Sequence, residues 1–459
     1  MTVRFLFTCI PGLGHLNPLL PIAFALKKAG HEVAIATAPI FSKTVTNVGL
    51  ECIPAGLDWD ERRLLETIPE LRAITPIYRG EWMMNNIFLN RSPHKMISDL
   101  SRIVPEWRPD MIVSGSFEYG GAVVAEKLGL PYATASYTIR WNPWILKHAI
   151  GRAITRLRAE NDLPADPELR MFGRHLDLCL APPSWAFEAA LLRPALTQLV
   201  RRKVLGPDLP LQQRLWGLKA LTLQTIFGRA MRANPKHLTV GATTRFIGEV
   251  VGLDPVPPPP AWLKAMPRQP TVFVTLGTVL SAEYPEIFEK LLTGLRDKSV
   301  NLVMTLGGRG DLCRFGQQPP NVRIVKFMTQ DELQELLPHV DLSINHAGYS
   351  SVMEVLLHGV PLVLLPLVSD APMNTQMCRF SGVTPELPSS VWGLSPKGLP
   401  IVRAEKLTPG ILTEAAMTAL SNPAYRAAAK AMQLELAARP GPKEAVRLLE
   451  QVAQGNKID

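Results

Sequence analysis

The stretch Val-Arg-Phe-Leu-Phe-Thr-Cys-Ile, residues 3–10, leads directly into the turn Pro11-Gly12-Leu13-Gly14. A short apolar run bounded by a turn is typical of a strand buried on both faces. Apolar residues then recur at helical spacing over residues 15–30, and residues 32–38 are predicted as the next strand. A strand, a helix and a second strand in succession predict a parallel α/β unit.

The same alternation continues further along the chain. A strand at 111–114 and a helix at 120–128 follow in the first half. After a proline run, five more strands are predicted, at 272–276, 302–306, 323–327, 342–345 and 362–365, with helices at 285–295, 331–337 and 351–358. Proline-rich chain forms a semi-rigid extended spacer. We therefore expect two doubly wound domains, 1–250 and 269–425, a linker at 251–268, and C-terminal helices at 426–459 that pack back on the first domain.

One segment of the first half departs from this alternation. Residues 144–237 are helical in pattern, rich in arginine and interrupted by prolines, which predicts a helical insertion or lid. Residues 140–240 hold 16 basic and 7 acidic residues, a surplus of 9 that equals the net charge of the whole chain, +9. Two interpretations have equal weight: a basic surface that meets anionic lipid or a phosphorylated substrate, and a solvated helical face. Nucleic-acid binding is disfavoured because no reader motif accompanies the basic residues.

Composition excludes several classes of protein. The 459 residues are 47% hydrophobic and 19% charged, which excludes a disordered chain and fits two or three domains. We expect no membrane-spanning helix, because the sequence has no run of 18 apolar residues. The N-terminal residues have no secretory pattern. The five cysteines have no spacing typical of zinc or disulfide sites, so we expect a cytoplasmic protein.

The first turn places a histidine at the start of a helix, at the carboxyl end of a strand. A dinucleotide-binding fingerprint would have a third glycine where Asn17 and Pro18 stand, and an acidic residue near Pro39. A nicotinamide or flavin cofactor is therefore disfavoured. A neutral imidazole can take a proton from a hydroxyl, so His15 is a candidate general base. The alternative is a histidine that caps or packs the helix.

Three loops of the second half follow strands and share one edge of the predicted sheet. Asn-His-Ala-Gly-Tyr-Ser-Ser, residues 345–351, opens a helix that carries Glu354 one turn further on. Gly277-Thr278 forms the second loop, and Asp370 with Asn374 the third. Small residues let backbone amides approach a phosphate, and a helix N-terminus favours negative charge. The three loops together predict a site for a nucleotide diphosphate.

With these motifs the chain resembles the UDP-glycosyltransferase superfamily. The resemblance covers nearly the whole chain and is most specific over residues 322–377. The chain is similar in particular to bacterial members that decorate natural products. It implies a GT-B fold, with two Rossmann-like domains facing across a cleft. It also implies a nucleotide diphosphate sugar as co-substrate and neither a further cofactor nor a metal.

The resemblance implies roles for individual residues. His15 corresponds to the general base, His346 to the histidine that touches the diphosphate, and Glu354 to the ribose acid. Residues 327–330 correspond to the segment that packs against the nucleotide base, with Thr329 in place of the usual proline. Motifs and resemblance together give a donor-binding set: Gly14, Gly277, Thr278, Phe327, Met328, Gln330, His346, Gly348, Ser350, Ser351, Glu354, Asp370 and Asn374.

Two positions depart from the family pattern. Asp370-Ala371 stands where the family has Asp-Gln, so one of two side chains that contact the sugar is missing. Gly115 stands where the family has the aspartate that orients its histidine, and a histidine without that carboxylate loses control of its tautomer. Glu118 follows three residues later, and the hypothesis is that it acts with His15 as a catalytic residue.

The predicted reaction is an inverting transfer of a sugar from a UDP- or TDP-linked donor to a hydroxyl of a small molecule. His15 removes the hydroxyl proton, and the helix N-terminus with His346 stabilises the leaving diphosphate. The alternatives are carbon glycosylation of a phenolic acceptor, a nucleotide-sugar epimerase or hydrolase, and a non-catalytic partner subunit. The Asp-Trp-Asp at 58–60 is interpreted as a solvated loop, not as a metal site.

The acceptor side is indicated by aromatic residues in the first half, where seven of the nine tryptophans lie. Aromatic and methionine side chains form adaptable apolar surface, which predicts a lipophilic acceptor, with core packing as the alternative. The arginine-rich segment 193–232 also carries leucines, which suggests peripheral contact with a membrane. The candidate acceptor residues are Trp82, Met83, Phe88, Phe117 and Trp141.

Overall fold

The computed structural model describes residues 2–137, 143–185, 242–248, 256–308, 310–395 and 399–458. The chain divides into two compact units. The first comprises Met1–Asp58, Trp82–Glu249 and Pro440–Asp459, and the second comprises Trp59–Glu81 and Val250–Arg439. This division differs from the boundaries expected from the sequence, because a segment from the first half and the helix α18 (Pro423–Ala438) belong to the second unit.

The first unit is built on a parallel sheet of seven strands in the order β3-β2-β1-β4-β5-β6-β7. The chain steps outward from β1 to β3 and then returns to the other side of β1, so the strand order reverses between β1 and β4. In open α/β sheets, ligands bind at such a reversal, at the carboxyl ends of the strands. The strands are β1 (Arg4–Thr8), β2 (Glu32–Thr37), β3 (Glu51–Pro54), β4 (Met111–Gly115), β5 (Tyr132–Ser136), β6 (Leu176–Cys179) and β7 (Thr244–Phe246).

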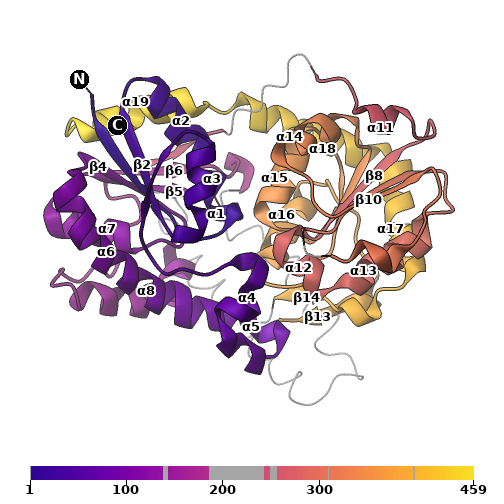
Figure 1. The fold of residues 1–459 in the computed structure, drawn as a ribbon, viewed down its shortest axis with the longest axis horizontal. Helices are drawn as coiled ribbons and strands as arrows, with labels where there is room; N and C mark the ends of the chain where they lie inside the picture. The colour runs from indigo at the N-terminus through magenta and orange to yellow at the C-terminus, as the bar shows by residue number, and fades with distance from the viewer. Residues whose placement is uncertain are drawn as a thin grey trace, which may run out of the picture. The chain divides into compact units, whose positions relative to one another are not determined.

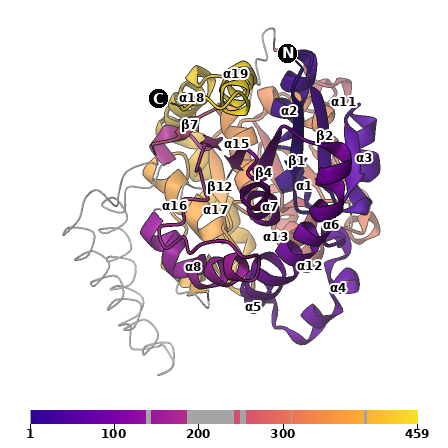
Figure 2. The same cartoon turned by 90° about the vertical axis from the view of Figure 1, so that its left-hand side faces the viewer.

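Helices cover both faces of this sheet. On one face α6 (Ser92–Trp107), α7 (Gly120–Leu128) and α8 (Pro143–Ala159) pack on strand residues such as Leu6 and Ile112. On the other, α19 (Pro442–Ala453) lies beside α2 (Leu20–Lys28), as Figures 1 and 2 both show. Glu450 of α19 accepts from His31 over 2.8 Å, which ties the end of the chain to the beginning of the first unit.

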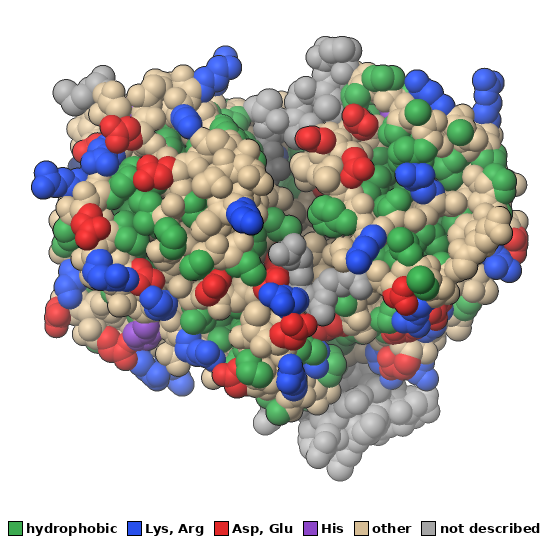
Figure 3. Space-filling model, viewed as in Figure 1, with side chains coloured by type: hydrophobic (Ala, Val, Ile, Leu, Met, Phe, Trp, Pro, Cys, Tyr) green, Lys and Arg blue, Asp and Glu red, His purple; other side chains and the backbone are tan. Residues whose placement is uncertain are grey.

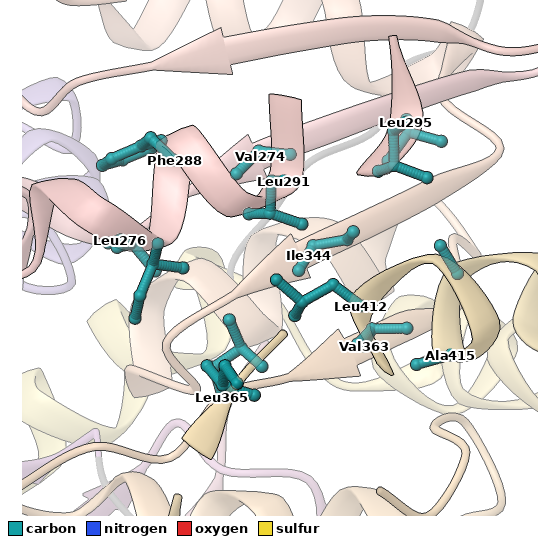
Figure 4. Packing of buried hydrophobic residues seen from close by; sticks show 14 of the residues in the cluster. Val274, Leu276, Phe288, Leu291, Leu295, Ile344, Val363, Leu365, Leu412 and Ala415 are labelled. Carbon is teal, nitrogen blue, oxygen red and sulfur yellow. The ribbon is translucent and has the colours of Figure 1, made fainter. Parts of the chain in front are cut away.

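The second unit repeats the plan with five parallel strands in the order β10-β9-β8-β11-β12. Here the order reverses between β8 and β11. Figure 4 shows Phe288 and Leu291 of α13 (Pro285–Leu295) and Leu412 of α17 (Pro409–Ser421) packed on strand residues such as Val274 and Ile344. The strands are β8 (Thr271–Thr275), β9 (Asn301–Thr305), β10 (Val322–Val325), β11 (Leu342–Asn345) and β12 (Leu362–Leu364).

The remaining helices of the second unit lie between its strands or follow them in the chain. α15 (Tyr349–Leu357) packs on β11 and on α18. The others are α11 (Ala261–Lys264), α12 (Gly277–Glu283), α14 (Gln330–Leu336) and α16 (Ala371–Phe380), and β13 (Trp392–Leu394) pairs antiparallel with β14 (Pro400–Val402).

The segment 59–81 of the second unit carries α4 (Leu64–Thr67) and the start of α5 (Pro76–Met83). Arg79 forms an ion pair with Glu283 of α12 over 2.8 Å, and Thr278 donates to Glu61 over 3.4 Å. The interpretation of residues 58–60 as a solvated loop is wrong for Trp59 and Asp60, which are 4% and 6% exposed. Burial of Asp60 is compensated by its hydrogen bond from Arg63.

The alternation of strands and helices is confirmed, with one helix corrected. The helix expected over 15–30 is two helices, α1 (Leu13–Leu16) and α2, because Pro18 cannot donate the backbone hydrogen bond that a continuous helix needs. Within the expected helical segment 144–237, α8 is followed by the strand β6. Residues 186–241, which include the segment 193–232, lie outside the described residues.

On the face shown in Figure 3, basic and acidic side chains of the described residues are interspersed among small hydrophobic areas. No extended patch of one charge sign is visible on this face among the described residues. None of the helices that the structure describes combines the length and the apolar character needed to cross a membrane.

Candidate functional site

The reversal point of the first unit is formed by the loops that follow β1 and β4. The loop after β1 runs into α1, which carries His15, and Gly14 beside it is exposed. The loop after β4 contains Phe117 and Glu118. β1 and β4 are neighbours, with Leu6 opposite Ile112. The two loops therefore meet where α/β sheets bind their ligands.

His15 is held at this point as a neutral imidazole. Its Nδ1 lies 2.8 Å from the hydroxyl of Tyr137, just beyond β5. Burial lowers the pKa of His15 to about 4, and a hydrogen bond to the Ser116 backbone opposes this only in part. Desolvation disfavours the charged form of an imidazole, so His15 is uncharged near neutral pH and has a lone pair with which to accept a proton.

Three aromatic rings surround His15. Tyr137 lies 5.5 Å and Phe117 5.8 Å from it in edge-on geometry, and Phe88 lies 6.5 Å away, all measured between ring centroids. Phe117 has a left-handed backbone, φ 64°, and Phe88 belongs to the π-helical segment Met84–Arg91. Non-α geometry of both kinds is enriched at functional sites. The rings give His15 an apolar surrounding.

The other predicted acceptor residues are placed differently. Met83 is buried in the interior at 7% exposure, and Trp82 is half-buried at the end of α5. Trp141 lies outside the described residues. Of the predicted acceptor set, Phe88 and Phe117 are the two that the structure brings to His15.

Glu118 is bound to other partners than the histidine it was expected to serve. Its carboxylate accepts from the Thr8 hydroxyl and from the backbone amides of Gly120, over 2.7 Å, and Gly121, over 3.0 Å. Burial is the largest influence on its pKa and raises it. These contacts fasten the start of α7 to β1. The side chain at Nδ1 of His15 is Tyr137, which the sequence reasoning missed, although it follows the strand next to β4.

The reversal point of the second unit is formed by the loops after β8 and β11, which bring Gly277 and His346 together. A Cβ atom on Gly277 would lie 2.8 Å from Cε1 of His346, and φ of Gly277 is 72°, so this position requires glycine. Nδ1 of His346 is buried and has no hydrogen-bond partner among the described residues. Burial lowers the pKa of His346 to about 4, so this imidazole too is neutral.

The turn from β11 into α15 is fixed by two polar side chains. Ala347 has φ 65°, and its amide donates to Asn345 over 2.9 Å. Asn374 donates to the carbonyl of Ala347 over 2.9 Å and to Asp370 over 2.8 Å, and burial raises the pKa of Asp370. The first turn of α16, which follows β12, thus supports the N-terminus of α15, where Gly348 is the N-cap.

At the first turn of α15 the N-cap Gly348 supplies no side-chain hydrogen bond, while the carboxylate of Asp370 accepts from the amide of Tyr349. Ser350 is exposed and Ser351 half-buried in this turn. The unsatisfied amides of a helix N-terminus and its partial positive charge favour anions such as phosphate. The predicted donor residues Gly277, His346, Gly348, Ser350 and Ser351 therefore share the edge at which β8 and β11 end, with Asp370 and Asn374 behind the turn.

The predicted base segment lies next to the predicted ribose acid. Gln330 and Gln334 of α14 both donate to Glu354 of α15. Phe327 is 49% exposed, whereas Met328 is buried. Thr329 stands at the N-cap of α14 and forms a capping box with Glu332, so threonine in place of the family's proline has a structural reason.

Among the residues that the structure describes, no group of three or more histidine, cysteine or acidic side chains is arranged to hold a metal ion.

Family models match both units. The N-terminal domain of the erythromycin biosynthesis protein CIII-like family matches residues 24–160, and its C-terminal domain matches residues 289–452, together more than half of the chain. The chain belongs to this family of bacterial natural-product glycosyltransferases. The motif resemblance stated from the sequence is thus confirmed at the level of the family.

Individual glycosyltransferases are similar over nearly their full length. Tylactone mycaminosyltransferase of Streptomyces fradiae is 26% identical over 98% of this chain and 92% of the relative. The 4'-demethylrebeccamycin synthase of Lentzea aerocolonigenes is 27% identical over 98% of this chain and 99% of the relative. Among solved structures, SnogD from Streptomyces nogalater has a TM-score of 0.61 at 21% identity, covering 99% of this chain and 100% of its own. The glycosyltransferase VinC, solved with DTDP, has a TM-score of 0.67 at 22% identity and the same coverage. These likenesses show the GT-B fold.

Proposed function

We propose that this glycosyltransferase moves a sugar from a nucleotide diphosphate donor to a hydroxyl of a lipophilic small molecule, with inversion at the anomeric carbon. The observation that carries the proposal is the pair of half-buried, neutral histidines, His15 and His346, each at the strand reversal of its own sheet. Each unit supplies one half of the chemistry.

The first unit supplies the base. The acceptor hydroxyl gives its proton to His15 as its oxygen forms the bond to the anomeric carbon. The bond between that carbon and the diphosphate oxygen breaks, and the nucleotide leaves with the electron pair. Positioned general bases contribute about 10²–10⁴-fold to the rate of such steps. The rings of Phe88 and Phe117 beside His15 support an apolar, ring-containing acceptor.

The second unit holds the donor. The amides of the first turn of α15 and the ring of His346 would bind the diphosphate and stabilise the charge that develops on it. Glu354 would accept from the ribose hydroxyls, and the exposed face of Phe327 would stack on the nucleotide base. The step as written needs no divalent metal and no further cofactor.

Thymidine is favoured over uridine as the base of the donor. One relative, 24% identical, is the TDP-daunosamine transferase DnrS of Streptomyces peucetius, and VinC was solved with DTDP. We extend this donor class to the present chain. Ala371, which stands in place of the glutamine that the family uses to contact the sugar, suits a donor sugar with fewer hydroxyl groups.

A transfer assay tests the proposal. The purified chain is incubated with TDP- or UDP-linked sugars of known anomeric configuration and with tylactone or aklavinone, acceptors that appear in the names of relatives. Mass spectrometry detects the glycoside, and the proton coupling at its anomeric carbon gives its configuration. We expect an inverted product, formed faster from TDP donors. A retained configuration, or consumption of the donor at the same rate without acceptor, would contradict the proposal.

A further inference from the structure

The hydroxyl of Tyr137 stands between two partners. Nδ1 of His15 lies 2.8 Å from it, and the carbonyl oxygen of Ser116 lies 3.2 Å from it. A carbonyl oxygen can only accept a hydrogen bond, so the single proton of the hydroxyl is directed to Ser116. The hydroxyl oxygen then accepts from His15, whose ring also has a hydrogen bond to the Ser116 backbone. With this assignment of the hydroxyl proton, Nδ1 carries the imidazole proton and the lone pair of the ring is at Nε2.

The position of the Tyr137 hydroxyl depends on residue 115 being a glycine. Gly115, at the end of β4, has no Cβ, and one built there would lie 3.3 Å from the Tyr137 hydroxyl and 3.2 Å from Cδ1 of Leu19. Contacts of that length are tighter than most real Cβ contacts, so the neighbouring atoms would have to shift by a few tenths of an ångström. The tyrosine hydroxyl thus fills the space that a side chain at position 115 would enter, next to His15.

Tyr137 is also fixed in place. Its side chain is 2% exposed, and its backbone amide donates to the Ser116 hydroxyl over 3.1 Å. Burial raises the pKa of its hydroxyl well above its usual range, so the group stays protonated and keeps its bond to the carbonyl. A buried hydroxyl with both of its hydrogen bonds made has one orientation.

We propose that Tyr137 is the positioning residue of the general base: its hydroxyl, relayed to the Ser116 carbonyl, holds His15 in the Nδ1-protonated tautomer in place of a carboxylate at position 115. This rests on the proposed function, in which His15 removes the acceptor proton. In the step, Nε2 takes that proton and the ring becomes an imidazolium bonded through Nδ1 to a neutral hydroxyl. The new proton leaves to solvent after the product.

The variant Tyr137→Phe removes the hydroxyl and keeps the ring. We expect kcat to fall about 10- to 100-fold, as for partial loss of a positioned base, with KM for the donor unchanged. Tyr132→Phe is the matched control, because it removes the buried hydroxyl at the start of β5, which is bonded to Glu126 and the Met171 carbonyl instead of His15. Its kcat should equal that of the wild type even if its melting temperature falls.

Nitrogen NMR of the uniformly ¹⁵N-histidine-labelled protein reads the tautomer without any substrate, and His15→Gln assigns the signals. We expect His15 to be protonated at Nδ1 in the wild type and in Tyr132→Phe, and to shift toward the Nε2-protonated form in Tyr137→Phe. The double variant Gly115→Asp/Tyr137→Phe gives the imidazole a carboxylate instead, and should recover at least tenfold in kcat over Tyr137→Phe.

The outcomes separate this inference from the proposed function. If His15→Gln is inactive but Tyr137→Phe keeps the wild-type kcat and tautomer, Tyr137 has no positioning role. The proposed role of His15 as general base would still hold in that case. An Nε2-protonated His15 in the wild type likewise overturns the inference. If His15→Gln keeps full activity, the proposed function itself fails, whatever the tautomer.

Discussion

A histidine lies at the strand reversal of each sheet, but the two imidazoles differ in their hydrogen bonding. In the first unit, Nδ1 of His15 is bonded to a protein hydroxyl, whereas in the second unit Nδ1 of His346 is buried without a partner among the described residues. An unsatisfied buried polar atom costs about 1–3 kcal/mol. One imidazole is thus oriented by a protein hydroxyl, and the other has a ring nitrogen whose hydrogen-bonding capacity is unused among the described residues.

The largest expected effect comes from removing each histidine in turn. His15→Ala should lower kcat by about 10²–10⁴-fold and leave nucleotide affinity unchanged, because it removes a base and no donor contact. His346→Ala should weaken TDP binding about tenfold or more, since it removes a hydrogen bond to a charged group. Steady-state kinetics and calorimetric titration with TDP measure the two effects. His94→Ala, at a surface histidine paired with Glu160, is the control. Equal losses of affinity in both variants would remove the distinction between the two sites.

A smaller effect is expected from the glycine that lies against His346. Gly277→Ala should displace the imidazole and weaken TDP binding, since its Cβ would lie 2.8 Å from that ring. Gly30→Ala is the matched control, because Gly30 also has a positive φ, 93°, but its Cβ would meet nothing within 4 Å. Both variants should lose about 1 kcal/mol of stability from backbone strain, measured by thermal unfolding. Only Gly277→Ala should lose affinity; unchanged affinity would mean that the ring is not part of the donor site.

The sequence predicted one of these sites better than the other. Around His346 the functional groups are close in the chain, since 345–354 spans one turn and one helix, and the motif alone indicated the site. Around His15 the partner is Tyr137, separated from it by 122 residues and brought to it by the order of β1, β4 and β5. Glu118 lies only three residues after Gly115, but its carboxylate is occupied by Thr8 and by the amides that begin α7. Spacing does not reveal which way such a side chain faces.

Prediction of the fold from the sequence was limited in the same way, by contacts between residues far apart in the chain. Strands with continuous apolar runs, such as β1 and β8, were predicted to within a residue or two. The short β3 and β6 carry polar residues and were missed, because pairing with their neighbours, and not local pattern, makes them strands. The excursion of 59–81 into the second unit rests on side-chain contacts such as Arg79 with Glu283, which no periodicity encodes.

The comparison also predicts a dependence of stability on pH. Both histidines have a pKa of about 4 in the folded chain against about 6.5 when unfolded, so the unfolded chain binds more protons. The free energy of unfolding should therefore fall as pH drops below 6.5, by up to about 2 kcal/mol per histidine at pH 5. Denaturant unfolding of His15→Gln and His346→Gln at pH 7.5 and 5.0 should show a weaker dependence than the wild type.

His358 is the control for that measurement. Burial and the nearby Lys430 lower its pKa to about 4 as well, but it lies at the far end of α15 from the N-terminal turn. His358→Gln should weaken the pH dependence equally and leave transfer unchanged. A pH dependence identical to wild type in all three variants would contradict the lowered pKa values.

The smallest expected effect concerns the capping box at the base segment. Thr329→Ala should cost about 1 kcal/mol, since it removes the N-cap of α14, and should raise KM for the donor about two- to threefold by loosening Phe327 and Gln330. Thr408→Ala removes the N-cap of α17 without a capping box and away from these residues. A similar loss of stability with no change in KM is expected for it. If the two variants shift KM alike, the base segment has no special part in donor binding.

A crystal structure of the chain with TDP tests the central claim most directly. The account predicts the diphosphate at the first turn of α15, with an oxygen within hydrogen-bond distance of the His346 ring and the base beside Phe327. A nucleotide bound at the carboxyl edge of the first sheet, on His15, or away from α15 altogether would contradict it.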